Sequence, residues 1–193
     1  FCDGAGNLVR CVIADNSAVL SGGGVYCNEG GFMASCLVTG NDADYGGGIN
    51  CYRGGRVVNC TVTDNEAYER GGGIRCVQGG TVYNSIIYAN IPANVAVTAG
   101  GALFGYSCIV PLEAGQGNIA ALPLFTNAAS GDYSLSELSP CIDAGTNLAE
   151  LAGTLDLAGM PRIFGARADM GAYEWVPEPC AAAAWLCACM MAW

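Results

Sequence analysis

The chain has 193 residues, among them 29 glycines and 12 cysteines, and it carries 17 acidic against 7 basic residues and no histidine. The net charge of −10 argues against nucleic acid as a partner, because phosphate contacts need clustered lysine and arginine. The absence of histidine excludes Ser-His-Asp and Cys-His nucleophile systems and every histidine-ligated metal site.

An internal repeat of 24–25 residues is the main signal from residue 2 to residue 110. Triple glycines recur at 22–24, 46–48 and 71–73. Cysteines and asparagines recur at the same period in three columns: Cys2, Cys27, Cys51 and Cys76; Cys11, Cys36 and Cys60; and Asn16, Asn41, Asn65 and Asn90. Self-similarity at such a period predicts a solenoid in which each repeat forms one coil.

The segments between the glycine clusters predict strands. Residues 57–63 and 81–88 are rich in β-branched and aromatic residues and are bounded by glycine and asparagine. Alternation along a strand predicts that Val58, Cys60 and Val62 share one face. No repeat contains a sustained helical pattern. We therefore predict an all-β fold, a parallel β-helix in which each strand pairs with the same strand of the next coil.

Each repeated residue type suits a column of identical neighbours. Equal positions on successive coils lie about 4.8 Å apart, the spacing of paired strands. Cysteine is small, buries well and stacks without charge repulsion. Asparagine can bond its side-chain amide to the amide one coil away and so form a ladder. Because stacked Cβ atoms exceed the roughly 3.5–4.5 Å of a disulfide, we expect mainly reduced thiol columns, with a disulfide framework as the alternative.

The repeat weakens toward its end. Phe104 stands where a cysteine is expected, and the Gly-Gly turn before Cys108 is missing. We expect residues 1–110 to form the β-helix coils and residues 111–175 to form an irregular β-rich cap over the open core. Residues 176–193 are expected to form an apolar tail whose last 14 residues carry no charge, and any membrane contact is expected through this tail alone.

Several short sequence motifs are typical of a known kind of protein. Residues 59–65 read Asn-Cys-Thr-Val-Thr-Asp-Asn, and residues 71–76 read Gly-Gly-Gly-Ile-Arg-Cys. These coils resemble those of bacterial right-handed parallel β-helix surface proteins with polymorphic outer-membrane-protein-like repeats. Residues 139–145, Ser-Pro-Cys-Ile-Asp-Ala-Gly, and 169–174, Asp-Met-Gly-Ala-Tyr-Glu, resemble a C-terminal module of the choice-of-anchor Q type. Residues 176–179, Val-Pro-Glu-Pro, are similar to the start of a PEP-type sorting signal whose basic end is missing.

The resemblance implies a right-handed coil, export, and a place outside the cell or on its surface. It does not imply catalysis. We therefore expect a non-enzymatic, monomeric stalk or adhesin-like module, with glycans or cell-envelope components as partners. The alternative is a polysaccharide lyase or glycoside hydrolase of the β-helix type that acts on acidic polysaccharide. A passive spacer without a ligand is the third possibility.

Charged residues that follow the ladder asparagines are the candidates for chemistry: Asp42, Asp44, Glu66, Glu69 and Arg70. On stacked coils these acids would lie within one or two coils of each other, and β-helix enzymes use such carboxylates with Ca²⁺ or as acid/base pairs. Arg70 would neutralise a uronate. The competing interpretation is a solvated loop edge that keeps the rod soluble, and we prefer it because a fold alone does not license a function.

We accordingly expect no catalytic residue and no resident cofactor or metal. Ca²⁺ is the one ion that the carboxylates would suit. Against it, the turn at residues 156–161 lacks the second aspartate of the Asp-x-Asp-Gly-x-Pro turn seen in the family that the chain resembles.

Overall fold

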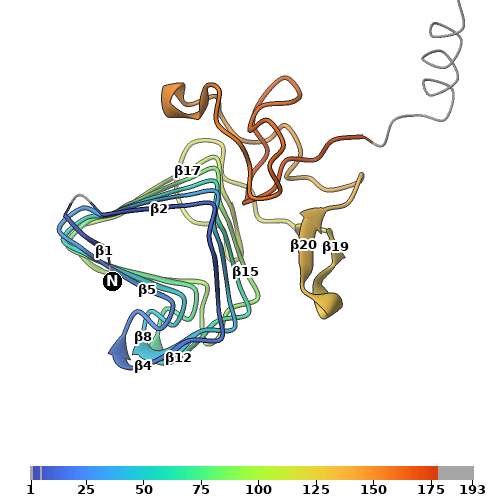
Figure 1. Cartoon of the computed structure of the whole chain (residues 1–193). Coiled ribbons are helices and arrows are strands. Elements are labelled where there is room, and N and C mark those ends of the chain that lie inside the picture. Colours follow the sequence, from blue (N-terminus) through green and yellow to red (C-terminus); the bar gives the residue numbers. More distant parts are fainter. Residues whose placement is uncertain (1, 5, 178–193) are drawn as a thin grey trace, which may run out of the picture.

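Each coil of the chain places one short strand in each of three parallel sheets, and three coils place a further strand in a spur beside them (Figure 1). The computed structural model describes residues 2–4 and 6–177. Sheet A consists of β1 (Cys2–Asp3), β5 (Val25–Asn28), β9 (Ile49–Tyr52), β13 (Ile74–Val77) and β16 (Val95–Ala99). Sheet B consists of β2 (Asn7–Val9), β6 (Phe32–Ala34), β10 (Arg56–Val58), β14 (Thr81–Tyr83) and β17 (Leu103–Gly105).

The remaining parallel strands form the third side of the coil and the spur. Sheet C consists of β3 (Val12–Ala14), β7 (Leu37–Thr39), β11 (Thr61–Thr63), β15 (Ile86–Tyr88) and β18 (Cys108–Ile109). Sheet D, which is the spur, consists of β4 (Ser17–Ser21), β8 (Asp42–Tyr45) and β12 (Glu66–Arg70). Every strand pairs with its counterpart one coil away, so the predicted parallel β-solenoid is confirmed, with about four turns.

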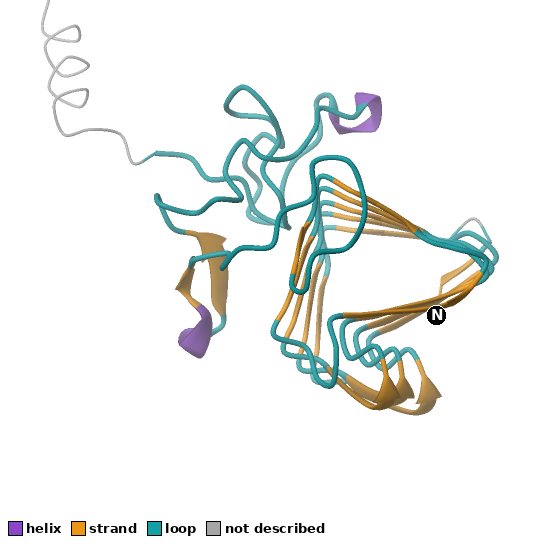
Figure 2. Cartoon of the chain, turned by 180° about the vertical axis from the view of Figure 1, so that it is seen from behind, coloured by secondary structure: helices purple, strands orange, loops and turns teal. Residues whose placement is uncertain are grey.

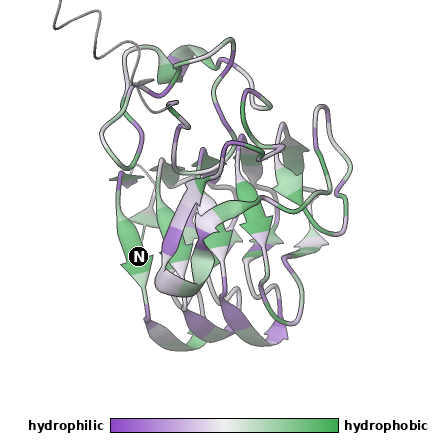
Figure 3. Ribbon diagram, turned by 90° about the vertical axis from the view of Figure 1, so that its right-hand side faces the viewer, coloured by the Kyte–Doolittle hydropathy of each residue, from purple (hydrophilic) through white to green (hydrophobic). Residues whose placement is uncertain are grey.

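The coils wind in the right-handed sense. In Figure 1 the chain passes clockwise from β1 to β2, down the side of β15 and on to the spur. Figure 3 shows the molecule from the side that is on the right in Figure 1, and the N-terminal coil lies at its left edge. The first coil is therefore nearest the viewer in Figure 1, and a clockwise path that recedes from the viewer is a right-handed helix.

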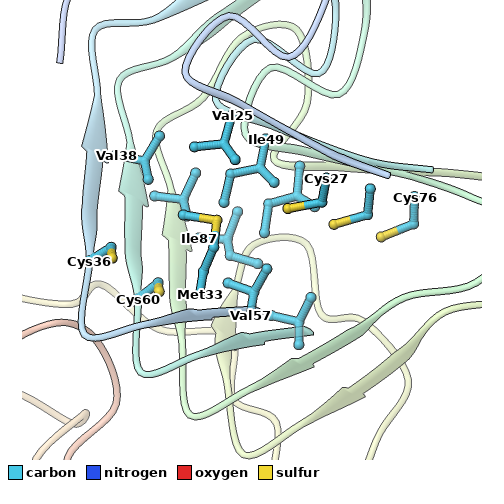
Figure 4. Close-up of a cluster of buried hydrophobic side chains, with 14 of the residues drawn as sticks. Val25, Cys27, Met33, Cys36, Val38, Ile49, Val57, Cys60, Cys76 and Ile87 are labelled. Carbon is cyan, nitrogen blue, oxygen red and sulfur yellow. The ribbon is translucent and has the colours of Figure 1, made fainter. Parts of the chain in front are cut away.

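The interior holds the first cysteine column in register. Cys2 pairs with Cys27, Cys27 with Cys51, and Cys51 with Cys76. Figure 4 shows the Cys27 and Cys76 side chains of this column beside valine and isoleucine side chains of the core. The nine cysteines of the described residues are all free thiols. The second column lies at the corner between sheets B and C, and Ser85 continues it by accepting a hydrogen bond from the Cys60 backbone N–H at 3.2 Å.

The alternation predicted for residues 57–63 is wrong at its first member. Val57 faces the interior together with Cys60 and Val62, whereas Val58 packs on the outside of the coil. The cause is Asn59, which occupies the corner with φ of 49°. A residue in the left-handed region turns the chain sharply, so the in-and-out alternation starts afresh after it.

The predicted asparagine ladder is confirmed. The side-chain amide of Asn16 donates to Asn41 Oδ1, Asn41 donates to Asn65, and Asn65 donates to Asn90, each at 2.9 Å. Each acceptor oxygen also takes the backbone N–H of the preceding asparagine at 3.0 Å. The sequence did not suggest the last member, Asn94, whose Oδ1 accepts from Asn90 at 2.8 Å and so ends the ladder.

The last coil is shortened at the spur, and its predicted strand assignment is wrong. The repeat predicts Phe104 at a cysteine position of the first column, but Phe104 pairs with Val82 in sheet B. The sheet A strand of this coil is β16, in which Val97 stands opposite Cys76. This coil has no strand in sheet D, so the chain reaches sheet A within a few residues and the period is lost.

The C-terminal segment, residues 111–177, follows the last coil and returns over it. Within it, Gln116 and Ile119 form backbone hydrogen bonds to the final coil and cover its edge. Most of the segment instead packs on the outer side face of sheets B and C (Figure 2), which the sequence did not suggest. It contains a hairpin, β19 (Phe125–Asn127) and β20 (Asp132–Leu135), and two single-turn 3-10 helices, Ala128–Ser130 and Ala149–Leu151.

A fully buried ion pair lies inside this segment. Arg162 Nη2 donates to Glu174 Oε2 at 2.7 Å, and both side chains are almost completely excluded from solvent. The nearby Asp169 carboxylate accepts the backbone N–H groups of Asp143 and Trp175. Burial raises the pKa of Asp169 to about 6.

The predicted apolar tail and sorting motif lie outside the described residues except for Val176 and Pro177. Among the residues that are described, no helix has the length and apolar character to cross a membrane.

Candidate binding groove

The spur is built from columns of small residues. Ala18, Ala43 and Ala67 pair in register, and the last two are buried. The triple glycines then carry the chain back against these strands. A Cβ added at Gly47 would overlap the backbone carbonyl of Glu66, so only glycine allows this close approach. With small residues inside, the larger side chains of the spur point outward.

An open groove of about 550 Å³ runs along the base of the spur. Figure 3 shows that β8 and β12, at the bottom of the view, are mostly hydrophilic. The lining contains four carboxylates and no basic side chain. The lining residues are Ser17, Ala18, Val19, Gly40, Asn41, Asp42, Ala43, Asp44, Asp64, Glu66 and Tyr68.

Two of the carboxylates occupy one column. Asp42 pairs in register with Glu66 on the next coil and with Ser17 on the preceding one. Paired strands place such neighbours about 4.8 Å apart. Ser17 Oγ donates to Asp42 Oδ2 at 2.8 Å. Asp42 and Glu66 are exposed to solvent, and Asp44 is half-buried.

Asp64 connects the groove to the C-terminal segment. Its φ of 55° places it in a turn. Its Oδ2 accepts hydrogen bonds from Tyr133 Oη at 2.9 Å and from Thr63 Oγ1 at 3.0 Å. Burial, together with this contact to Asp64, raises the pKa of Tyr133. The Tyr133 ring is held edge-on by Phe125, with centroids 5.3 Å apart.

Three of the five predicted candidates lie in the groove and two lie outside it. Asp42, Asp44 and Glu66 line the groove, whereas Glu69 and Arg70 do not. A register shift in β12 places Arg70 opposite Tyr45, beyond the groove, and both Glu69 and Arg70 are exposed. Arg70 therefore lies outside the lining.

Tyr68 lines the groove although it was not among the five candidates, and strand alternation could have identified it. Tyr68 lies two positions after Glu66 on β12, so alternation puts both on the same face. Its side chain is 84% exposed. The ring is therefore accessible to a ligand that enters the groove beside the carboxylates.

Metal binding finds no support among the described residues. Across residues 2–4 and 6–177, no group of three or more cysteine, aspartate or glutamate side chains is arranged to hold an ion. In the turn at 156–161, the two carboxylate oxygens of Asp156 accept the backbone N–H groups of Met160 and Glu174, at 2.7 and 2.8 Å. That carboxylate therefore serves the turn itself.

No protein-family profile matches the chain, and searches of curated proteins and of solved structures found nothing similar to it.

Proposed function

We propose that the chain is a non-enzymatic module of an exported surface protein, a rigid β-helical stalk whose spur presents a glycan-binding groove. The observation that carries the proposal is the lining: exposed Asp42 and Glu66 carboxylates one coil apart, with the Tyr68 ring beside them. Ionised carboxylates accept hydrogen bonds from hydroxyl groups, and an exposed aromatic face packs against the apolar face of a sugar ring.

The solenoid supports the role of a stalk. Each coil is bonded to the next through every strand and through the buried asparagine ladder. An in-register stack of this kind has no internal hinge, so the spur is presented in a fixed orientation. The export and surface parts of the proposal rest on the resemblance of residues 139–145 and 169–174 to a choice-of-anchor module.

The charge of the groove indicates which glycans fit. Four carboxylates line it without a basic side chain, so a uronate or a sulfated sugar would be repelled. Neutral sugars offer hydroxyl donors, and amino sugars add an ammonium group that the carboxylates attract. We therefore propose neutral glycans and amino-sugar glycans as the ligand class.

The test is a glycan array with neutral, amino-sugar and uronate members, followed by calorimetry on the hits. We expect binding of the first two classes and loss of at least tenfold in affinity for Asp42→Asn, Glu66→Gln or Tyr68→Ala. Glu69→Gln is the matched control, because Glu69 lies on the same strand outside the groove. Preferential binding of uronates, or equal losses for Glu69→Gln and Glu66→Gln, would contradict the proposal.

A glycoside hydrolase is the second candidate, and the pair Asp42 and Glu66 favours it. The two residues stand opposite each other on neighbouring coils, and retaining enzymes use a pair of carboxyl groups on one site. A reducing-end assay on each glycan that binds distinguishes the two functions. Release of reducing ends that disappears in Asp42→Asn would replace the binding module by an enzyme.

A further inference from the structure

Two buried cysteines lie outside the stacked columns. In the last coil the corner position is occupied by Ser107, whose Oγ accepts the Ser85 backbone N–H at 3.1 Å. Cys108 is the next residue, so it points out of the coil instead of into the corner. Cys141 belongs to the Ser-Pro-Cys turn of the C-terminal segment, 33 positions later. Both side chains are 0% exposed.

The two thiols meet in one apolar cluster. Cys108 and Cys141 pack together with Ile86, Leu135 and Met170, between sheet C and the C-terminal segment. Each thiol shifts the pKa of the other, so the two side chains are near neighbours. The Cys108 thiol donates to the carbonyl oxygen of Ala121 at 3.2 Å.

This geometry differs from that of the columns. Stacked cysteines such as Cys36 and Cys60 project in the same direction from neighbouring strands, so their Cβ atoms keep the strand spacing of about 4.8 Å. Cys108 lies on β18 of sheet C and Cys141 lies in a turn of the C-terminal segment, so the spacing of paired strands does not set the distance between their Cβ atoms. We propose that Cys108 and Cys141 form a disulfide that fastens the C-terminal segment to the last coil when a low-molecular-weight disulfide is available.

The reaction is a thiol–disulfide exchange in two steps. The Cys108 thiolate attacks one sulfur of the small disulfide, which forms a mixed disulfide and releases one small thiolate. The Cys141 thiolate then attacks the Cys108 sulfur, which forms the protein disulfide and releases the second small thiolate. The two cysteine protons end on the two released thiolates. One small disulfide is reduced as the two cysteines are oxidised.

In the closed segment, contact between the two thiols lowers the pKa of Cys108 and raises that of Cys141. Because both sulfurs are fully buried in the folded chain, the exchange takes place while the C-terminal segment is still open. The loop that the disulfide closes contains the β19–β20 hairpin, including Tyr133, which contacts Asp64 in the groove.

The test uses the whole chain, folded in a redox buffer of glutathione and glutathione disulfide, then denatured and alkylated. We expect two of the 12 cysteines to escape alkylation. Cleavage after Glu113 and Glu137 separates the two cysteines, so mass spectrometry identifies the linked peptides directly. The disulfide closes a loop of 33 positions, and its formation should raise Tm by about 10 °C.

Two alanine variants complete the test. Cys108→Ala should retain all its remaining thiols, and its Tm should be the same with and without glutathione disulfide. Cys36→Ala, which alters a stacked column, should lose the same two thiols as the wild type. The proposal is overturned if the wild type keeps all its thiols, if the linkage maps to column cysteines, or if the linkage leaves Tm unchanged. None of these outcomes depends on the ligand of the groove.

Discussion

Truncation of Asn65 to alanine tests whether the ladder holds the coils together. Asn65 is 1% exposed and its side chain takes part in five hydrogen bonds. The two N–H groups of its amide are shared among three acceptors, which are the carbonyl oxygens of Val38 and Thr63 and Asn90 Oδ1, at 2.9–3.0 Å. Its oxygen accepts the backbone N–H and the side-chain amide of Asn41. Alanine removes all five bonds at once.

The size of the stability loss follows from the buried polar groups that Asn65→Ala leaves without their partners. The buried backbone N–H of Asn41 loses this acceptor, and an unsatisfied buried group costs about 1–3 kcal/mol. The carbonyl oxygens of Val38 and Thr63 and the amide of Asn41 lose one bond each, at roughly 0.5–1.5 kcal/mol per bond. We expect Asn65→Ala to lower the free energy of unfolding by about 4 kcal/mol.

Asn16→Ala is the matched control, because Asn16 belongs to the same column in the first coil. Its side chain is exposed and donates to Asn41 Oδ1 and to the Ala14 carbonyl. Water can replace these bonds, so the loss should be about 1 kcal/mol or less. Urea unfolding followed by far-ultraviolet circular dichroism under reducing conditions measures both variants. Losses for Asn65→Ala and Asn16→Ala that agree within about 0.5 kcal/mol would refute the reasoning.

Three further predictions concern Asp169, the buried Arg162–Glu174 pair and a glycine of the spur. Burial raises the pKa of Asp169 to about 6, so its charged form lowers stability above that pH, and this loss disappears as the pH falls toward the ordinary value. The wild type should therefore gain about 1.3 kcal/mol in the free energy of unfolding between pH 7 and pH 5, and Asp169→Asn should lack this gain in thermal unfolding. Glu174→Gln should cost about 3–5 kcal/mol because it leaves the buried Arg162 charge unpaired, and adding Arg162→Met should recover part of that loss in urea unfolding. Gly47→Ala should lower the free energy of unfolding by about 3 kcal/mol, because its Cβ overlaps a carbonyl group of the next coil. Gly131→Ala should lower it by only about 1 kcal/mol, because Gly131 has open space around it although its φ is 80°. Similar losses for both variants in urea unfolding would contradict the steric explanation.

Local periodicity accounts for most of what was predictable about the coils. Residues that recur every 24–25 positions must stack, so the parallel strands and the Asn41–Asn65 contact follow from spacing alone. The alternation failed at Val58, because a single left-handed residue at a corner resets it. The last coil was misassigned for a similar reason: without a strand in the spur, its spacing no longer matches the period.

The candidate groove was predicted only in part. The spacing of Asp42 and Glu66 placed them on neighbouring coils, and the structure puts them side by side in one lining. Arg70 was grouped with them because it is near in sequence, but a shift in the register of β12 carries it to another column. Shifts of this kind depend on how the triple glycines turn the chain back against the spur strands, and the spacing of residues in the sequence does not predict them.

The sequence by itself determined the stacking: repeated residues specify repeated coils, because each coil meets only its neighbours and equal positions come into contact. Only the tertiary structure decided where the C-terminal segment lies. Its contacts, such as Cys141 against Cys108 and Tyr133 against Asp64, join residues that do not repeat and are far apart in the chain. They are fixed by shape and burial on the outer face of the sheets, and periodicity carries no information about that face.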